Sequence, residues 1–231
     1  MSDSDTDTLI AEIQRQQGVL KARLDDEQNA LTELAKRLWA QQESDKARLS
    51  RELHDGVGQL LTGLTRRLQT MASTDPAVSE LADIAELALS DVRQLSRLMS
   101  PTILDDLGLK PALNWLCRNL FEHEQINYTC EVDVNADLPK DISILIFRVT
   151  QESLVNSIKH AYSSDVKITV RQHFNMVKLS LIDNGKGFTR DKITPGVGLA
   201  SIEDRAKAFN AELTINSSPE NGTRISLTIP L

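Results

Sequence analysis

The sequence predicts a two-part protein, in which an all-α region of long helices precedes an α+β sandwich domain. Apolar residues recur every three or four positions through most of the first 100 residues, which is the period of an amphipathic helix. Short runs that alternate apolar and polar residues begin near residue 127, as half-buried strands do. A proline and a glycine interrupt the helical pattern at residues 100–108, so the boundary is predicted there.

The first helix is expected to run from about residue 8 to about residue 72 and to begin as a coiled coil. Seven of the ten a and d positions from Ile10 to Gln41 are Leu or Ile, and sustained spacing of this kind indicates a coiled coil. The eleven-residue step from Leu38 to Leu49 marks a slip of the heptad register. Residues 1–45 are therefore assigned to an N-terminal coiled-coil helix.

A second helix is predicted from Pro76 to about Met99, because proline suits the first position of a helix and apolar residues then recur at helical spacing. A short loop makes the two helices an antiparallel hairpin. Each apolar stripe is too wide for one neighbour, so we expect two hairpins to form a dimeric four-helix bundle. Residues 46–105 are assigned to this hairpin and residues 106–231 to the domain that follows.

The second part holds five strand-like runs and two longer helical stretches. Strands and helices do not alternate strictly, which favours an α+β sandwich over a doubly wound sheet. The predicted strands are residues 127–134, 166–173, 176–183, 211–218 and 223–231, and the helices are about 139–161 and 198–209.

Composition limits the class of protein. Hydrophobic residues make up 40% and charged residues 26% of the chain, as in ordinary soluble domains. The net charge of −7 argues against direct nucleic-acid binding, which needs a basic face. The sequence has neither a membrane-spanning apolar run nor a signal peptide, so a cytoplasmic protein is expected.

Polar residues share one face of the predicted helix 139–161. Glu152, Asn156, Lys159 and His160 follow one another at spacings that place them together. An ordinary solvated face would favour Glu–Lys pairs, whereas Asn is a poor helix former and its carbonyl oxygen suits Mg²⁺. Lys159 and His160 could contact phosphate oxygens.

Two glycine-rich segments follow. A predicted strand ends at Asp183, and Gly185 and Gly187 follow it within "DNGKGF". An ordinary hairpin turn would give the same pattern. "GVGL" places Gly196 and Gly198 before a helix start, where backbone N–H groups can bind an anion. Together with the Asn-bearing helix, these segments follow one another within about 60 residues, which is a more specific signal for a phosphate-binding site than any one of them.

These segments resemble the ATP-binding superfamily of DNA gyrase, heat-shock-ninety chaperones, sensor histidine kinases and MutL. The resemblance covers about residues 106–231 and implies that Asp183 accepts a hydrogen bond from adenine and that Asn156 holds Mg²⁺ on ATP. It also implies a mobile lid over residues 184–197. The implied nucleotide-binding residues are Asn156, Lys159, His160, Asp183, Gly185, Gly187, Gly196, Gly198, Leu199 and Thr223.

The stretch "RELHDGVGQLL" is unusual for a helix because Gly56 and Gly58 each cost ~1 kcal/mol relative to alanine. A single exposed histidine needs no function, but the paired glycines leave room for an approaching surface. His54 is a nucleophile near neutral pH. Asp55 could hold its tautomer, and Gln59 could orient a water.

This stretch resembles the phosphoacceptor box of histidine kinases that are paired with helix-turn-helix response regulators. The resemblance implies autophosphorylation of His54, transfer to an aspartate of a receiver domain, and phosphatase activity through Asp55 and Gln59. Glu152 is a fourth candidate catalytic residue. The implied cofactors are ATP and Mg²⁺, and the implied partners are a second copy of the chain, a response regulator and an upstream sensor protein.

Three alternatives share the ATP site: a catalytically silent ATP-binding signalling scaffold, a serine kinase acting as an anti-sigma factor, and a gyrase-type ATPase that would use Glu152 as a base. The serine-kinase alternative does not explain the His-Asp pair in the first helix. Incubation with labelled ATP would distinguish a silent scaffold from a histidine kinase.

Overall fold

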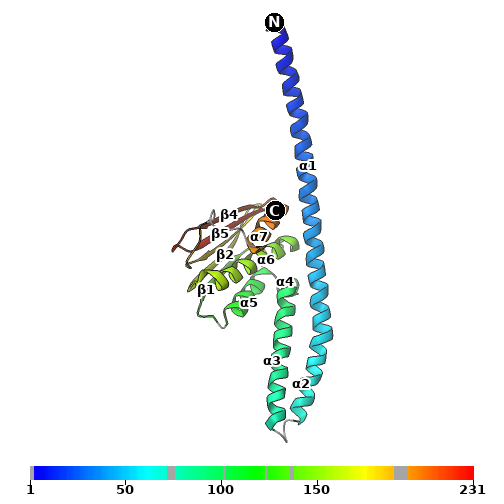
Figure 1. The fold of residues 1–231 in the computed structure, drawn as a ribbon, viewed down its shortest axis with the longest axis vertical. Helices are drawn as coiled ribbons and strands as arrows, with labels where there is room; N and C mark the ends of the chain where they lie inside the picture. The colour runs from blue at the N-terminus through cyan, green and yellow to red at the C-terminus, as the bar shows by residue number, and fades with distance from the viewer. Residues whose placement is uncertain (1–2, 72–75, 101, 123, 136–137, 190–196) are drawn as a thin grey trace.

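The computed structural model describes residues 3–71, 76–100, 102–122, 124–135, 138–189 and 197–231. As predicted, a long helical part precedes an α+β sheet domain (Figure 1). The elements are α1 (Asp3–Glu52), η1 (Leu53–Gly58), α2 (Gln59–Met71), α3 (Pro76–Met99), α4 (Thr102–Leu107), α5 (Leu109–Phe121), β1 (Asn127–Asp133), α6 (Lys140–Asn156), η2 (Ser157–Ala161), β2 (Asp165–His173), β3 (Met176–Asp183), α7 (Val197–Ala208), β4 (Glu212–Ser217) and β5 (Thr223–Pro230).

The first helix differs from the expected continuous α-helix at one place. Residues Leu53–Gly58 form a π-helical turn, η1, between α1 and α2. Such turns insert a residue into an α-helix and are frequent at functional sites. Gly56 and Gly58 lie within η1 and weaken the competing α-helical conformation, since glycine is a poor helix former.

In the hairpin, α2 packs against α3, and a wide apolar surface of the helices stays exposed. Ala82, Ala85 and Leu89 of α3 are buried. A buried pair of serines joins α1 to α3, because Ser50 Oγ donates to Ser96 O at 2.8 Å and Ser96 Oγ donates to Ser50 O at 2.9 Å. The exposed apolar side chains on α1, η1, α2 and α3 include Leu20, Leu24, Leu31, Leu34, Leu38, Val57, Leu60, Leu64, Leu81, Ile84, Leu87 and Leu95.

The sheet has the strand order β1-β2-β3-β5-β4, with β1 parallel to β2 and the other pairs antiparallel. Alternate residues of β2, β3 and β5 are buried, so one sheet face contacts the helices. That core includes fully buried Leu113, Phe147, Ile168, Leu179 and Leu227. Helices α6 and α7 lie on the side of the sheet that faces α1 (Figure 1).

The domain limits proposed from the sequence fall within helices. The limit after residue 45 lies inside α1, and the limit after residue 105 lies inside α4. None of the helices in the described ranges combines the length and apolar character that crossing a bilayer requires.

Candidate functional site

A cavity of about 580 Å³ opens between α6, η2, the end of β3 and the start of α7. Drug-sized ligands occupy cavities of ~300–1,000 Å³. Nine of the residues expected to hold a nucleotide or to act on it line this cavity: Glu152, Asn156, Lys159, His160, Asp183, Gly187, Gly198, Leu199 and Thr223. The structure thus brings together segments that lie up to 71 residues apart in the sequence.

Asp183 is the buried acid of the cavity and is only 5% exposed. Its Oδ1 accepts a hydrogen bond from the Gly185 amide at 2.9 Å, and its Oδ2 accepts one from Ser157 Oγ at 3.3 Å. Thr223 lies directly beside it, because the two residues are paired in the β3–β5 register. An acidic side chain is thereby fixed at the inner end of the cavity.

Glycines around Asp183 allow segments of backbone to approach closely. A Cβ at Gly185 would lie 2.5 Å from both the Cβ and the carbonyl oxygen of Ala161. At Gly187 and Gly222, φ is +59° and +70°, and a Cβ would overlap a carbonyl oxygen at each position. These contacts explain why Gly185, which does not itself line the cavity, is still needed to build its wall.

Gly198 brings the start of α7 against α6. A Cβ there would overlap Oε1 of Glu152 and lie 3.5 Å from Nδ2 of Asn156. The two polar side chains of α6 therefore face the first turn of α7, whose backbone N–H groups can bind an anion. Gly196, the other expected glycine of this segment, lies outside the described residues, as does much of the expected lid.

Several lining residues were missed by the sequence reasoning. Ser157 binds Asp183, and Lys186 and Phe188 line the cavity from the loop after β3. Nζ of Lys186 lies 4.8 Å from the ring centre of Tyr162. The cation inside "DNGKGF" was a usable signal for Lys186, whereas Ser157 depends on a contact across 26 residues.

The lining chemistry fits a nucleotide with a divalent cation. The acid at the inner end can accept from an amino group, and Lys159, His160 and Lys186 are exposed donors for phosphate oxygens. Among the described residues, no group of three or more His, Cys, Asp or Glu side chains could hold a metal ion by itself. Asn156 also lines the cavity, and its side-chain carbonyl oxygen is a type of ligand that Mg²⁺ accepts.

His54 lies on the π-helical turn and is exposed to solvent. Its side chain is 63% exposed, and its Nδ1 lies 3.0 Å from Oδ1 of Asp55, which is 66% exposed. Gln59 is exposed at the first position of α2. In the tautomer with the proton on Nδ1, this nitrogen donates a hydrogen bond to Asp55, and the lone pair of Nε2 is free toward solvent.

The sequence analysis expected both glycines near His54 to leave room for an approaching surface. The structure agrees for Gly56 but not for Gly58. Nothing lies within 4 Å of a Cβ at Gly56, so that position faces open space. Gly58 is buried, and a Cβ there would make an ordinary contact of 3.6 Å with Leu53 O. The clearance interpretation therefore fits Gly56 and not Gly58, because Gly58 is buried within the hairpin.

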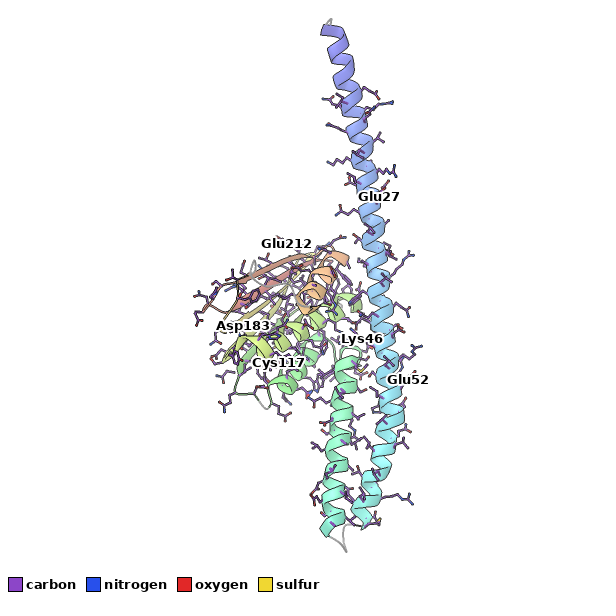
Figure 2. All side chains as sticks on the ribbon, viewed as in Figure 1. Glu27, Lys46, Glu52, Cys117, Asp183 and Glu212 are labelled. Atoms are coloured by element: carbon purple, nitrogen blue, oxygen red, sulfur yellow. The ribbon has the colours of Figure 1, made fainter. Side chains whose placement is uncertain are left out.

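His54 and the cavity belong to separate parts of this structure. The cavity is lined by α6, η2, β3 and the loop after it, α7 and β5, and by no described residue of η1 or α2. Figure 2 shows Asp183 within the sheet domain, well apart from Glu52 on α1 beside the histidine turn.

Both the helical part and the sheet domain of the chain match models of known protein families. Residues 45–104 match the family model "Histidine kinase", and residues 141–231 match the model "Histidine kinase-, DNA gyrase B-, and HSP90-like ATPase". The histidine kinase domain of the blue-light activated histidine kinase of Erythrobacter litoralis EL346 shares the fold, with a TM-score of 0.51 and 17% sequence identity over 83% of this chain and 94% of that chain.

Curated relatives agree with this assignment. The chain is 30% identical over 82% of its length to the signal transduction histidine-protein kinase/phosphatase DegS of Brevibacillus brevis, and 31% identical over 82% to the oxygen sensor histidine kinase NreB of Staphylococcus carnosus. It spans about half the length of these relatives, 52% and 57% respectively. With both of its domains matched, the chain belongs to the histidine kinase family.

Proposed function

We propose that this chain is an ATP-dependent protein histidine kinase that phosphorylates itself on His54 and passes the phosphoryl group to an aspartate of a response regulator. The observation that carries the proposal is the exposed His54–Asp55 pair, at 3.0 Å, in the same chain as the nucleotide cavity. A catalytically silent ATP-binding scaffold is the alternative. It would give no reason for an exposed, oriented histidine beside an open glycine position.

Asp183 and Thr223 are proposed to receive the adenine, and Lys159, His160 and Lys186 the phosphates. Asn156 would contribute its side-chain carbonyl oxygen to a bound Mg²⁺, which supplies charge neutralisation on the phosphates. The proposed catalytic role of Glu152 rests on its place beside Asn156 and Gly198.

In the proposed reaction, Nε2 of His54 attacks the γ-phosphorus of ATP. A phosphorus–nitrogen bond forms as the bond to the ADP oxygen breaks. Asp55 accepts the Nδ1 hydrogen bond and stabilises the positive charge that develops on the ring. Phosphoryl transfer needs mainly positioning and charge neutralisation, so the ATP-binding domain must reach His54 during the cycle.

We infer that the chain acts as a homodimer. Exposed leucines continue along α1, α2 and α3 on surfaces that a single hairpin does not cover, and soluble monomers rarely expose apolar patches of this extent. A second copy fits because the same stripes recur on it, as a four-helix bundle requires. Leu60→Glu should convert a dimer into a monomer in size-exclusion chromatography with light scattering. A dimer that persists in this variant would contradict the assignment.

The test of the kinase is incubation with γ-labelled ATP. The wild-type chain should form an acid-labile, base-stable phosphoprotein, and His54→Gln should form none while still binding nucleotide. His173→Gln is the matched control, because His173 is an exposed histidine at the end of β2 in the sheet domain. Equal labelling of the His54→Gln variant would show that another residue accepts the phosphoryl group. No labelling of the wild-type chain would favour the catalytically silent scaffold.

Phosphatase activity toward the regulator is proposed through Asp55 and Gln59. Gln59→Ala should retain autophosphorylation and slow the loss of phosphate from a phosphorylated receiver domain. Gln69→Ala, an exposed glutamine on the same helix, should not change it. Dephosphorylation at the wild-type rate in the Gln59→Ala variant would remove Gln59 from this role.

A further inference from the structure

The chain has two cysteines, and the structure places both at the contact between α5 and β1 of the sheet domain (Figure 1). Cys117 lies in the second half of α5 and is fully buried, whereas Cys130 lies on the edge strand β1 and is half-buried. Both are free thiols in this structure. Neither lines the cavity around Asp183, so the proposed kinase gives them no role.

The packing of α5 against β1 brings the two sulfur atoms together. The chain leaves α5 after Phe121 and returns along β1, so Phe121 meets Tyr128 near the turn, with ring centroids 5.5 Å apart and planes at 32°. Four residues back along a helix cover about 6 Å, and two residues forward along a strand cover about 6.6 Å. The next facing pair is therefore Cys117 and Cys130, and their thiols are hydrogen-bonded to each other.

The surroundings give the two thiols different reactivity. The hydrogen bond from the Cys117 thiol lowers the pKa of Cys130, burial opposes this effect, and the positive charge of Lys110 on α5 adds to it. The same hydrogen bond, together with burial, raises the pKa of Cys117. Because the thiolate is the form that reacts with oxidants, Cys130 is the reactive member of the pair, and Cys117 stays protonated beside it.

We propose that Cys117 and Cys130 form a reversible disulfide, which makes the contact between α5 and β1 a redox-sensitive cross-link of the sheet domain. The oxidant is a hydroperoxide, and hydrogen peroxide is the probe for it. This modification site goes beyond the proposed kinase activity and does not depend on it.

The reaction takes two steps. The Cys130 thiolate attacks one oxygen of hydrogen peroxide, the O–O bond breaks, and a sulfenic acid and hydroxide form. The hydroxide takes up the proton that Cys130 had released. The sulfur of Cys117 then attacks the sulfenic sulfur, and its proton leaves with the departing hydroxyl group as water. Two thiols thereby lose two electrons in total, and one peroxide is reduced to two molecules of water.

The bond would attach β1 covalently on its helix side. β1 is an edge strand that pairs with β2, and thirteen residues separate Cys117 from Cys130 along the chain. A cross-link across a loop of this length restricts the unfolded chain far more than the folded one. We therefore expect the oxidised sheet domain to unfold at a temperature roughly 5–10 °C above that of the reduced form.

The test treats the full chain with hydrogen peroxide and digests it with trypsin without reduction. Cleavage after Arg118 separates the two cysteines into peptides 98–118 and 119–140. The oxidised wild-type chain should yield these two peptides joined, with a mass two hydrogens below their sum, and dithiothreitol should separate them. The higher unfolding temperature should appear with the joined peptides and disappear with dithiothreitol.

Single substitutions are the matched controls and test the order of attack. Cys117→Ser leaves Cys130 to form a sulfenic acid that dimedone should label. Cys130→Ser should stay unlabelled at the same peroxide concentration, because its remaining thiol is fully buried. Neither variant should show the rise in unfolding temperature after oxidation.

Three results would overturn the proposal or part of it. Separate peptides with both thiols free in the oxidised wild-type chain would show that the pair does not form a disulfide. Peptide 119–140 joined to a second copy of itself would show that Cys130 reacts between chains instead. Equal dimedone labelling of the Cys130→Ser and Cys117→Ser variants would refute the assignment of Cys130 as the attacking thiol.

Discussion

The turn that carries His54 and the cavity around Asp183 differ in how completely one chain builds them. Asp183 is 5% exposed, with both carboxylate oxygens hydrogen-bonded, and close backbone contacts fix the walls around it. His54 is 63% exposed, and its described polar contact is with the adjacent Asp55. The walls of the cavity are thus fixed by the folding of one chain, whereas the side chain of His54 is left open to solvent.

If the cavity depends on close backbone packing, its glycines should be far less tolerant than those of the helices. Gly185→Ala should destabilise the sheet domain by about 3 kcal/mol, because the new methyl group would overlap the backbone of Ala161. Gly18→Ala should be neutral or stabilising, since nothing lies within 4 Å of its Cβ. Thermal unfolding followed by circular dichroism checks both, and equal effects would remove the contrast between the two regions.

If Asp183 is the preorganised acceptor, then Asp183→Asn should weaken ATP binding roughly ten- to a hundredfold, the usual effect of losing a charged hydrogen-bond partner. The fold should persist, because the amide oxygen can still accept from Gly185. Titration calorimetry with a nonhydrolysable ATP analogue measures the affinity. Asp133→Asn, on the edge strand β1, is the control, and wild-type affinity in the Asp183 variant would refute the assignment.

If the histidine turn is open because surfaces must approach it, adding a methyl group there should help the helix and hinder the reaction. Gly56→Ala should raise the free energy of unfolding by up to ~1 kcal/mol and slow phosphorylation of His54. Gly58→Ala, at the buried position, should affect phosphorylation less. Denaturant unfolding and initial labelling rates test the pair, and faster phosphorylation of the Gly56→Ala variant would contradict this reading.

The smallest expected effect is that of pH on the contact between α1 and the sheet domain, where Glu43 accepts hydrogen bonds from Arg148. Burial raises the pKa of Glu43, but the bonds to Arg148 outweigh it, so the stabilisation is fully present above the ordinary value of 4.5 and is lost as the pH falls through the lower value in the folded chain. Trp39 is buried on the same stretch of α1. With the other tryptophan of the chain replaced by phenylalanine, Trp39 emission should stay constant down to that range and shift below it. The groups that set this pKa are Arg148 and Lys46, with Arg205 close enough to interact. In Glu43→Gln, the dependence should flatten.

The sequence by itself determined the order and type of the long helices and the strands, and nine of the residues that line the cavity. Helical and strand periods are local, and Asn156, Asp183 and Gly198 stand in short motifs whose residue types already indicate their chemistry. The strands β1 to β5 consequently lie within about one residue of the predicted limits. His54 and Asp55 are adjacent in the chain, so their pairing was also predictable.

Only the tertiary structure decided the π turn, the burial of Gly58 and the docking of the sheet domain on α1. Arg148 and Glu43 are 105 residues apart, and nothing in the period of either helix indicates the other. Such a pair is fixed by how whole elements pack, and its burial depends on the surfaces around it. Arg148 lies among the buried residues of α6, and only packing shows that its side chain binds the end of α3 and Glu43 of α1.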